Sequence, residues 1–201
     1  MFTGIVTAKA TVQCAALNEG VMRLTVDCPE GYTEGLVRGA SVSVNGVCLT
    51  AVEWTDASIS FDVIDESLRR SNLGGVQLDN LVNLERAARI GDEIGGHLLS
   101  GHVHTQATVL AITSEGGNVA MQLRVDPEWA PYVISKGYIA INGCSLTIGE
   151  VDAGDFWLHL IPETLRITNF CECLVGHALN VEIDHQTQVI IETVERYLSQ
   201  R

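Results

Sequence analysis

Apolar and polar residues alternate along short stretches of the chain, and glycine, proline or asparagine interrupts each stretch after a few residues. The stretch 21–28 alternates in this way up to Pro29, and the stretch 41–44 alternates up to Asn45 and Gly46. A period of two is typical of strands with one buried face. An Asn-Gly pair between two such stretches favours a hairpin turn, because both residues tolerate positive φ. The pattern therefore predicts β-strands joined by turns.

The first half of the chain follows this pattern throughout, without a long stretch of helical periodicity. We expect strands at 4–15, 21–28, 41–44, 49–54, 59–64 and 81–85. Residues 66–73 are expected to form a helical turn or a loop. Short strands at close spacing favour a small closed antiparallel barrel, since closure leaves no exposed sheet edge.

The second half of the chain repeats the first at a constant spacing. Residues 45–50, Asn-Gly-Val-Cys-Leu-Thr, correspond to Asn-Gly-Cys-Ser-Leu-Thr at 142–147, which gives a spacing of 142 − 45 = 97 residues. The same spacing relates 66–73 to 163–170. This period is far longer than that of solenoid repeats, so each copy is large enough to be a domain. The sequence predicts a tandem duplication.

The second copy is expected to form the same elements as the first. Its strands are expected at 105–112, 119–125, 138–141, 146–151, 156–161 and 179–183, with a helical turn near 129–134. We therefore predict an all-β fold of two tandem antiparallel barrels. The expected domains are 1–97 and 98–187, followed by a helix at 188–201.

The C-terminal stretch differs from the rest because its apolar residues recur at helical spacing. They are Val189 or Ile190, then Val194, then Tyr197 or Leu198. An isolated helix of about 15 residues is marginal in water, so it needs a surface to pack against. That surface is either its own barrel or another copy of the chain, and the sequence leaves both open.

Composition narrows the class of protein and its partners. Hydrophobic residues make up 46% and charged residues 18%, which favours a packed core over disorder. The formal net charge of −13 repels nucleic acid and anionic membranes, so we expect neither as a partner. No apolar run reaches the length of a membrane span, and the first residues lack the features of a signal peptide. We expect a cytoplasmic protein.

Two matched pairs of polar residues are the first candidates for chemistry. Cys48 and Ser145 occupy the same position in the two copies, and each is followed two residues later by a threonine, Thr50 or Thr147. Positions i and i+2 of a strand point to one face. The pairs are therefore either two equivalent binding surfaces or a structural feature that duplication copied.

The histidines and cysteines indicate neither a metal site nor disulfide bonds. His97, His102 and His104 cluster where the second copy begins, but no carboxylate or thiol near them has a metal-ligand spacing, so we expect no metal site. Six cysteines without a Cys-x-x-Cys pair are expected to be free thiols, mostly buried. His102 stands where the first copy has the apolar Ile5, so it is either a residue with a role specific to the second copy or an ordinary surface histidine.

The motifs together resemble the riboflavin synthases of the α-subunit type, across essentially the full length. The segments that carry the resemblance are 1–6 (Met-Phe-Thr-Gly-Ile-Val), 45–50, 83–87, 95–103 (Gly-Gly-His-Leu-Leu-Ser-Gly-His-Val), 142–147 and 160–165. The resemblance implies two six-stranded Greek-key barrels and a C-terminal trimerisation helix. It also implies a reaction without a cofactor, in which two molecules of 6,7-dimethyl-8-ribityllumazine dismutate by four-carbon transfer into riboflavin and 5-amino-6-ribitylaminouracil.

The resemblance further implies that the barrels of neighbouring subunits form each active site in a homotrimer. One lumazine would contact Gly4, Ile5, Val6, Ser145, Leu146, Thr147, His159, Leu160, Ile161, Pro162, Glu163 and Thr164. The other would contact Cys48, Leu49, Thr50, Asp62, Val63, Ile64, Asp65, Glu66, Ser67, Gly101, His102 and Val103, with Lys136 of the adjoining chain. Whether the chain also associates with a lumazine synthase is a question that the sequence leaves open.

Chemical roles follow from the same resemblance. Cys48 is a candidate nucleophile or positions one, with water or a ribityl hydroxyl as an alternative, and His102 is a candidate proton shuttle. Ser145 and Thr147 are candidates for assisting proton loss from the 7-methyl group of the second lumazine, with Asp184 orienting them.

Two observations set limits on the resemblance. Ser67 and Ser71 stand where the family usually has threonine, and Arg70 replaces a smaller or apolar residue. The alternative function is that of the lumazine or flavin antenna proteins, which keep the double barrel as a binding module. Those proteins generally have degenerate motifs in one copy, whereas both copies are intact here. The sequence therefore favours the enzyme.

Overall fold

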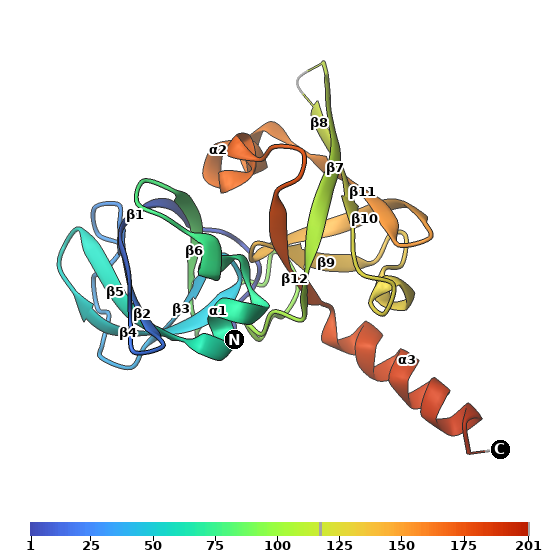
Figure 1. The fold of residues 1–201 in the computed structure, drawn as a ribbon, viewed down its shortest axis with the longest axis horizontal. Helices are drawn as coiled ribbons and strands as arrows, with labels where there is room; N and C mark the ends of the chain where they lie inside the picture. The colour runs from blue at the N-terminus through green and yellow to red at the C-terminus, as the bar shows by residue number, and fades with distance from the viewer. Residues whose placement is uncertain (117, 201) are drawn as a thin grey trace.

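The computed structural model describes residues 1–116 and 118–200, which form two closed six-stranded barrels and a C-terminal helix (Figure 1). Around the first barrel the strands follow the order β1, β2, β5, β4, β3, β6, with every neighbouring pair antiparallel. Their bounds are β1 (Ala8–Asn18), β2 (Val21–Asp27), β3 (Ser41–Val44), β4 (Val47–Trp54), β5 (Ser58–Ile64) and β6 (Leu81–Arg86).

The second barrel has the same strand order, which reads β7, β8, β11, β10, β9, β12 when it starts from the equivalent strand. Its strands are β7 (Thr105–Glu115), β8 (Asn118–Arg124), β9 (Tyr138–Ile141), β10 (Cys144–Asp152), β11 (Asp155–Leu160) and β12 (Ala178–Ile183). In the first barrel the consecutive strands β3, β4 and β5 lie side by side, and the preceding strand β2 pairs with β5. In the second barrel β9, β10 and β11 lie side by side, and β8 pairs with β11. This is a Greek-key arrangement. The predicted fold is confirmed.

Alternation along the strands fills the two barrels with apolar side chains. In β5, Ile59, Phe61 and Val63 are fully buried, while Ser60 and Asp62 between them are partly or fully exposed. Each barrel has its own apolar core, and the two cores share no buried residue. Both barrels are therefore independently packed, and their pairing must rest on other contacts.

Turns and short helices connect the strands where the sequence indicates them. Asn45 and Gly46 join β3 to β4 with φ of 47° and 82°, and Asn142 and Gly143 join β9 to β10 with nearly the same angles. Residues 66–73, expected as a helical turn or a loop, belong to short helices. These helices are α1 (Asp65–Arg70) and η1 (Asn72–Gly75), and their twins are α2 (Pro162–Ile167) and η3 (Asn169–Glu172). A further short helix, η2 (Ala130–Tyr132), lies at the helical turn expected near 129–134.

The expected first strand at 4–15 is wrong at its start, because β1 begins only at Ala8. Residues 2–6 instead run to the second barrel. Phe2 and Leu99 exchange two backbone hydrogen bonds of 2.8 and 3.0 Å, and Val6 is buried in the core of the second barrel. The apolar residues that resembled a strand start are thus explained by a contact that the local pattern cannot reveal.

Six asparagines, three from each copy, hold the two barrels together. Asn83 donates through its amide to the Asn142 carbonyl at 3.0 Å, and its twin Asn180 donates to the Asn45 carbonyl at 2.8 Å. The backbone N–H groups of Asn72 and Asn169, the third pair, donate to the side chains of Asn180 and Asn83. These reciprocal bonds relate the barrels by an approximate two-fold axis, and their buried polar groups are satisfied across it.

The same axis brings the two Asn-Gly turns into contact. A Cβ on Gly46 would lie 2.7 Å from the Gly143 nitrogen, and a Cβ on Gly143 would lie 2.8 Å from the Gly46 nitrogen. Both residues have positive φ, so any larger residue is excluded by the backbone as well as by space. The Asn-Gly motif therefore makes a hairpin within each barrel and a close approach between them.

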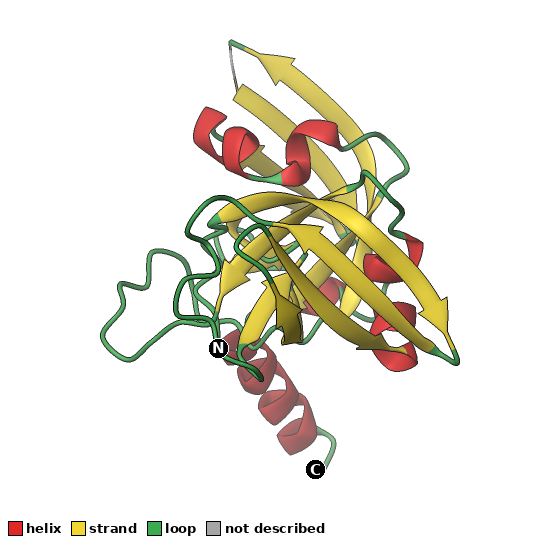
Figure 2. Ribbon diagram, turned by 90° about the vertical axis from the view of Figure 1, so that its left-hand side faces the viewer, coloured by secondary structure: helices red, strands yellow, loops and turns green. Residues whose placement is uncertain are grey.

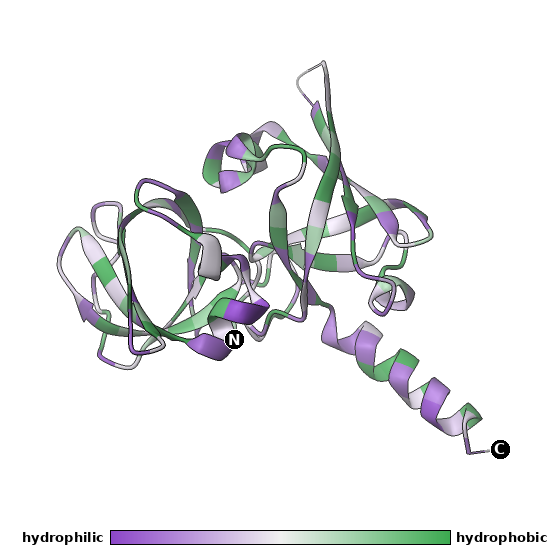
Figure 3. Cartoon of the chain, viewed as in Figure 1, coloured by the Kyte–Doolittle hydropathy of each residue, from purple (hydrophilic) through white to green (hydrophobic). Residues whose placement is uncertain are grey.

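Helix α3 (His185–Leu198) projects from the second barrel rather than lying along it (Figures 1 and 2). None of its residues is buried, and the apolar residues on it alternate with polar ones along its length (Figure 3). Its side chains Ile190 and Leu198 are 64% and 63% exposed. Of the two surfaces considered from the sequence, its own barrel therefore does not cover this helix.

The cysteines are free thiols, as expected, but the expectation that most of them are buried is wrong. Only Cys144 is buried, while Cys171 is exposed and Cys14, Cys28, Cys48 and Cys173 are partly exposed. Burial raises the pKa of the Cys144 thiol to about 12, which keeps it protonated and unreactive near neutral pH.

Within residues 1–116 and 118–200, no helix combines the length and apolar character that a membrane crossing requires.

Candidate active site

A cavity of about 210 Å³ lies on the first barrel where β4, α1 and the segment before β7 meet. We call the residues around it the first site. Three of them, Val47, Arg70 and Ser71, were not predicted as contacts. The structure also brings together six residues that were predicted to contact one lumazine: Cys48, Glu66, Ser67, Gly101, His102 and Val103.

The backbone of Gly101 passes directly beside Cys48 in this first site. The Cys48 N–H donates to the Gly101 carbonyl at 2.8 Å. A Cβ on Gly101 would lie 2.5 Å from the Cys48 Cβ, and Gly101 has φ of +81°. Glycine is needed here because a side chain would collide with Cys48 and would strain the left-handed backbone. The second half of the chain thus completes a site on the first barrel.

A buried carboxylate fixes this crossing segment. Glu182 of β12 accepts hydrogen bonds from the Ser100 N–H at 2.7 Å, the Ser100 hydroxyl at 2.8 Å and the Gly101 N–H at 3.0 Å. Burial raises the pKa of the Glu182 carboxyl, and its hydrogen bonds to Ser100 oppose that rise. Hydrogen bonds to an ionised acceptor are strong, so Glu182 holds the segment in a defined position.

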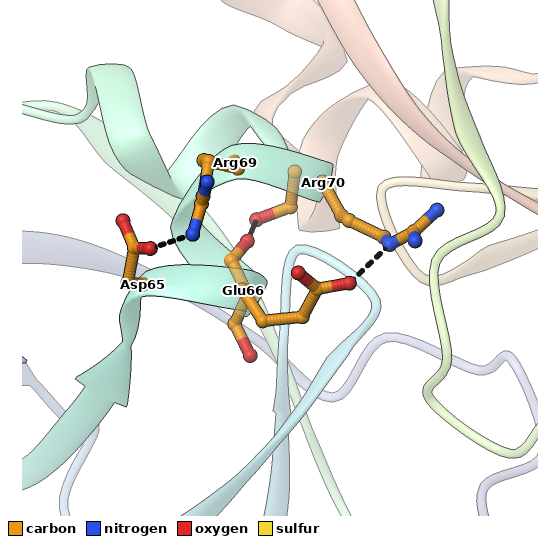
Figure 4. Close-up of polar contacts among 6 residues, drawn as sticks. Asp65, Glu66, Arg69 and Arg70 are labelled. Atoms are coloured by element: carbon orange, nitrogen blue, oxygen red, sulfur yellow. Dashed lines mark hydrogen bonds and ion pairs between the residues drawn. The ribbon is translucent and has the colours of Figure 1, made fainter.

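Helix α1 supplies charged side chains at the mouth of the first site (Figure 4). Arg70 donates to Glu66 at 2.6 Å, and Arg69 pairs with Asp65 one helical turn away. The hydrogen bond from Arg70 lowers the pKa of the Glu66 carboxyl. Arg70 was not predicted as a site residue, although its i+4 position relative to the predicted Glu66 places both on one face of the helix.

An equivalent arrangement surrounds Ser145 on the second barrel, and we call it the second site. The Ser145 N–H donates to the Gly4 carbonyl at 2.8 Å, and a Cβ on Gly4 would lie 2.6 Å from the Ser145 Cβ. Glu85, the twin of Glu182, accepts from the Thr3 N–H at 2.6 Å, the Thr3 hydroxyl at 2.8 Å and the Gly4 N–H at 3.0 Å. Burial raises the pKa of Glu85 too. Each barrel is therefore completed by the leading segment of the other copy.

One feature of the second site has no equivalent in the first. His97 Nδ1 lies 2.6 Å from the Ser145 hydroxyl, and the His97 ring stacks on Tyr138 with centroids 5.2 Å apart. Burial lowers the pKa of His97, and the Asp184 carboxylate opposes that shift. Sequence reasoning placed His97 in a histidine cluster but did not predict it as a site residue.

The three clustered histidines lie in three different environments. His97 contacts Ser145, His102 lines the first site, and His104 Nε2 lies 3.2 Å from the Gln188 amide oxygen at the base of α3. Within the described part of the chain, no group of three or more histidines, cysteines or carboxylates is placed to hold a metal ion. Nearness in sequence does not bring these side chains to one point.

Asp184 is the N-cap of α3. Its carboxylate accepts from the Thr187 N–H at 3.0 Å and from the Thr187 hydroxyl at 2.8 Å, so its contacts are those of a helix cap. Its only effect on the second site that the structure reveals is electrostatic, through the pKa of His97. Lys136 lies in the loop before β9 with φ of 68°, and it does not line the first site of its own chain.

The remaining predicted contacts differ in burial. Leu49, Val63 and Leu160 are buried in the barrel cores. The others are partly or fully exposed: Ile5, Thr50, Asp62, Ile64, Asp65, Leu146, Thr147, His159, Ile161, Pro162, Glu163 and Thr164.

The sequence and fold match known proteins along the whole chain. The lumazine binding domain family matches twice, at residues 3–87 and 100–184. The riboflavin synthase of Escherichia coli strain K12 is 44% identical over 202 residues, covering 100% of this chain and 95% of that protein. The riboflavin synthase of Chlamydia pneumoniae is 39% identical and covers 99% of this chain and 98% of that protein.

Solved structures show the same fold. LumP complexed with riboflavin superposes with a TM-score of 0.85 at 28% identity, covering 92% of this chain and 100% of that chain. LumP complexed with 6,7-dimethyl-8-(1'-D-ribityl) lumazine gives 0.84 at 26% identity, with the same coverage. The full-length relatives support an enzyme of the riboflavin synthase type. With two lumazine binding domains and full-length similarity to riboflavin synthases, the chain belongs to the lumazine-binding family that includes those enzymes.

Proposed function

We propose that this chain catalyses the dismutation of two 6,7-dimethyl-8-ribityllumazine molecules. One molecule transfers a four-carbon unit to the other, which yields riboflavin and 5-amino-6-ribitylaminouracil without a cofactor. The observation that carries the proposal is the pair of equivalent sites, one per barrel, each built around a polar side chain at the same position, Cys48 or Ser145. A reaction between two copies of one molecule needs two such sites, because catalysis depends on orienting the reacting carbons.

The roles of individual residues are part of this proposal. Cys48 and His102 line one cavity, so the thiol can position or provide the nucleophile and the imidazole can move a proton. A water molecule or a ribityl hydroxyl remains an alternative nucleophile. Ser145 and Thr147 assist proton loss from the second lumazine.

Assembly into a homotrimer is proposed from the exposed helix α3. Its apolar side chains, Val189, Ile190, Val194 and Leu198, are between 47% and 64% exposed, and a second or third copy of the helix would cover them. Deleting residues 188–201 should shift the species in sedimentation velocity from trimer towards monomer. A trimer that survives the deletion rules out α3 as the assembly element. In the proposed trimer, Lys136 would reach the first site of a neighbouring subunit.

Turnover of a single substrate tests the proposed function. Purified protein incubated with 6,7-dimethyl-8-ribityllumazine alone should form riboflavin at half the molar amount of lumazine consumed. The measurement is quantification of riboflavin and of the remaining lumazine by chromatography with fluorescence detection. Consumption without riboflavin, or another ratio, would contradict the dismutation.

A binding module is the second candidate, because LumP shares the fold and has been solved with riboflavin and with a lumazine. The two functions separate in the same experiment. Tight fluorescent binding without any turnover favours the binding module, and turnover at the stated ratio favours the enzyme. The cytoplasmic location stays a prediction, and association with a lumazine synthase stays an open question.

A further inference from the structure

The segment that carries His97 is packed tightly against the second site. A Cβ on Gly96 would lie 2.3 Å from the Thr3 carbonyl oxygen, 2.7 Å from the Ser145 Cβ and 3.0 Å from the Ser145 Oγ. Two residues after His97, Leu99 pairs with Phe2 through two backbone hydrogen bonds. The chain on both sides of His97 is therefore fixed, and the imidazole cannot move far from Ser145.

The His97 ring has one polar partner. Its Nδ1 lies 2.6 Å from the Ser145 hydroxyl oxygen, and Tyr138 covers the ring with an interplanar angle of 21°. The side chain is 8% exposed, and its Nε2 is buried without a hydrogen-bond partner among the described residues. A buried polar atom without a partner is uncommon and calls for a functional explanation. Ser145 is partly exposed, so its hydroxyl group is accessible to a ligand in the second site.

The charges around His97 favour a neutral imidazole that can accept a proton. Burial lowers its pKa, so the ring is neutral near pH 7. The groups that act on it are the Ser145 hydroxyl, the Tyr138 ring and the Asp184 carboxylate. The Asp184 carboxylate favours the protonated ring, so a transferred proton gains a compensating charge.

The first site lacks this arrangement. Cys48 replaces Ser145, Ser41 replaces Tyr138, and the Cys48 thiol makes no hydrogen bond to a histidine within residues 1–116 and 118–200. Its histidine, His102, comes from the crossing segment instead and is exposed. The two sites therefore differ in their capacity to take up a proton through a hydroxyl group.

We propose that His97 is a positioning residue that activates Ser145 as a base, and that the lumazine bound in the second site is the one that loses a proton from its 7-methyl group. This inference rests on the proposed function and assigns a chemical role to one of its two sites. His97 Nδ1 accepts the hydroxyl hydrogen of Ser145, which leaves the serine lone pairs free to face the ligand.

The proton balance of the step is complete within the chain and its substrate. A C–H bond of the 7-methyl group breaks, and its proton passes to Ser145 Oγ. The hydroxyl proton of Ser145 passes at the same time to His97 Nδ1, which becomes an imidazolium. The electron pair of the broken bond stays on the lumazine, delocalised into its ring system. The carbanion then attacks the lumazine held at the first site of a neighbouring subunit, and His97 returns its proton through Ser145 in a later step.

The test measures proton exchange and turnover in the same variants. In D2O, the 7-methyl signal of 6,7-dimethyl-8-ribityllumazine is followed by proton NMR, and enzyme-dependent exchange is obtained by subtracting a buffer blank. His97→Gln should reduce both kcat for riboflavin and the exchange rate about 100-fold, with KM changed less than about two-fold. His177→Gln is the matched control, since His177 is exposed and belongs to neither site, and it should behave as wild type.

One further measurement separates activation of Ser145 from a structural role. The wild-type exchange rate of the 7-methyl protons should fall at acidic pH, below the usual pKa of about 6.5, as His97 takes up a proton. This acidic limb should disappear from the residual exchange of Ser145→Ala, a substitution that only removes a hydroxyl group.

The outcomes distinguish the inference from the proposed function. If wild-type protein forms no riboflavin, the proposed function fails. If wild type turns over but His97→Gln keeps its kcat and exchange rate, or Ser145→Ala keeps the acidic limb, the role of His97 is wrong. Loss of riboflavin with undiminished methyl exchange would also overturn the inference, since His97 would then act at a later step.

Discussion

The first and second sites share a frame, by which we mean the crossing glycine and the buried glutamate, but they carry different chemical groups. In both, a glycine from the other copy lies against the central side chain, and a buried glutamate fixes the crossing segment. At the centre, a thiol in one site corresponds to a hydroxyl in the other, and only the hydroxyl has a buried imidazole behind it. Duplication has preserved the residues that build a site, while the residues that act on a ligand have diverged. Such divergence suits a reaction in which one molecule is donor and its twin is acceptor.

The largest expected effect concerns the shared frame. Glu85→Ala and Glu182→Ala each leave three buried or partly buried donors without an acceptor, so each should lower the free energy of unfolding by about 3 kcal/mol. Urea unfolding followed by tryptophan fluorescence measures both. Glu53→Ala, which removes an exposed partner of Arg23, serves as the control and should leave the midpoint unchanged. A large effect in only one of the two glutamate variants would break the symmetry of the frame.

The next effect concerns the glycines at the crossing points. Gly4→Ala and Gly101→Ala should each cost about 2 kcal/mol more than Gly20→Ala, because only the first two methyl groups collide with a neighbour. Gly20 has the same positive φ and open space around it, so it isolates the backbone strain. Thermal unfolding of the three variants provides the comparison. Equal losses would mean that the close approach contributes nothing.

A smaller effect is specific to the second barrel. His104 accepts from the Ile183 N–H at Nδ1 and donates to Gln188 from Nε2, so its neutral form is the bonded one, whereas its twin Thr7 donates its hydroxyl hydrogen to the Leu84 carbonyl. Burial, the largest cause, lowers the pKa of His104. The unfolded chain therefore binds the proton more readily, and stability is lost as pH falls from about 6.5 through the folded pKa.

Between pH 7 and 5, wild type should therefore lose more stability than a variant without this imidazole. This extra loss is obtained as the difference between wild type and His104→Gln in urea unfolding at each pH. His177→Gln should reproduce the wild-type curve. A His104→Gln variant with the full wild-type pH dependence would show that another group titrates.

The smallest effect tests the mouths of the two sites. Arg70→Ala and Arg166→Ala each break an exposed ion pair on α1 or α2, and neither should change the midpoint of thermal unfolding. Because Arg70 lines the first site, its loss should weaken lumazine binding a few-fold in fluorescence titrations. A lower midpoint of thermal unfolding for Arg70→Ala would show that Arg70 stabilises the fold instead.

Much of this fold follows from the sequence because its signals are local. The period of two, the Asn-Gly turns and the 97-residue spacing predict the strands, the hairpins and the duplication. The first strand was misplaced because Ile5 and Val6 resemble a strand start, yet Val6 packs in the second barrel. No local pattern indicates which of two similar barrels a segment joins, since that choice depends on tertiary contacts.

The sites could be predicted in composition but not in detail. Twin positions pointed to Cys48 and Ser145, and the structure places each beside the glycine expected to share its site. His97 could not be recognised in this way, because it lies outside the segments that match between the two copies and because its partner Ser145 is 48 residues away. Comparing twins finds what duplication preserved, so it overlooks a residue that serves only one site.

The central claim is that each chain holds two lumazines in non-equivalent sites, and ligand stoichiometry tests it most directly. Ser145→Ala protein, slowed in turnover, is titrated with 6,7-dimethyl-8-ribityllumazine by equilibrium dialysis at low temperature. The account predicts two molecules bound per chain at saturation, with unequal affinities. Saturation at one molecule per chain would contradict it.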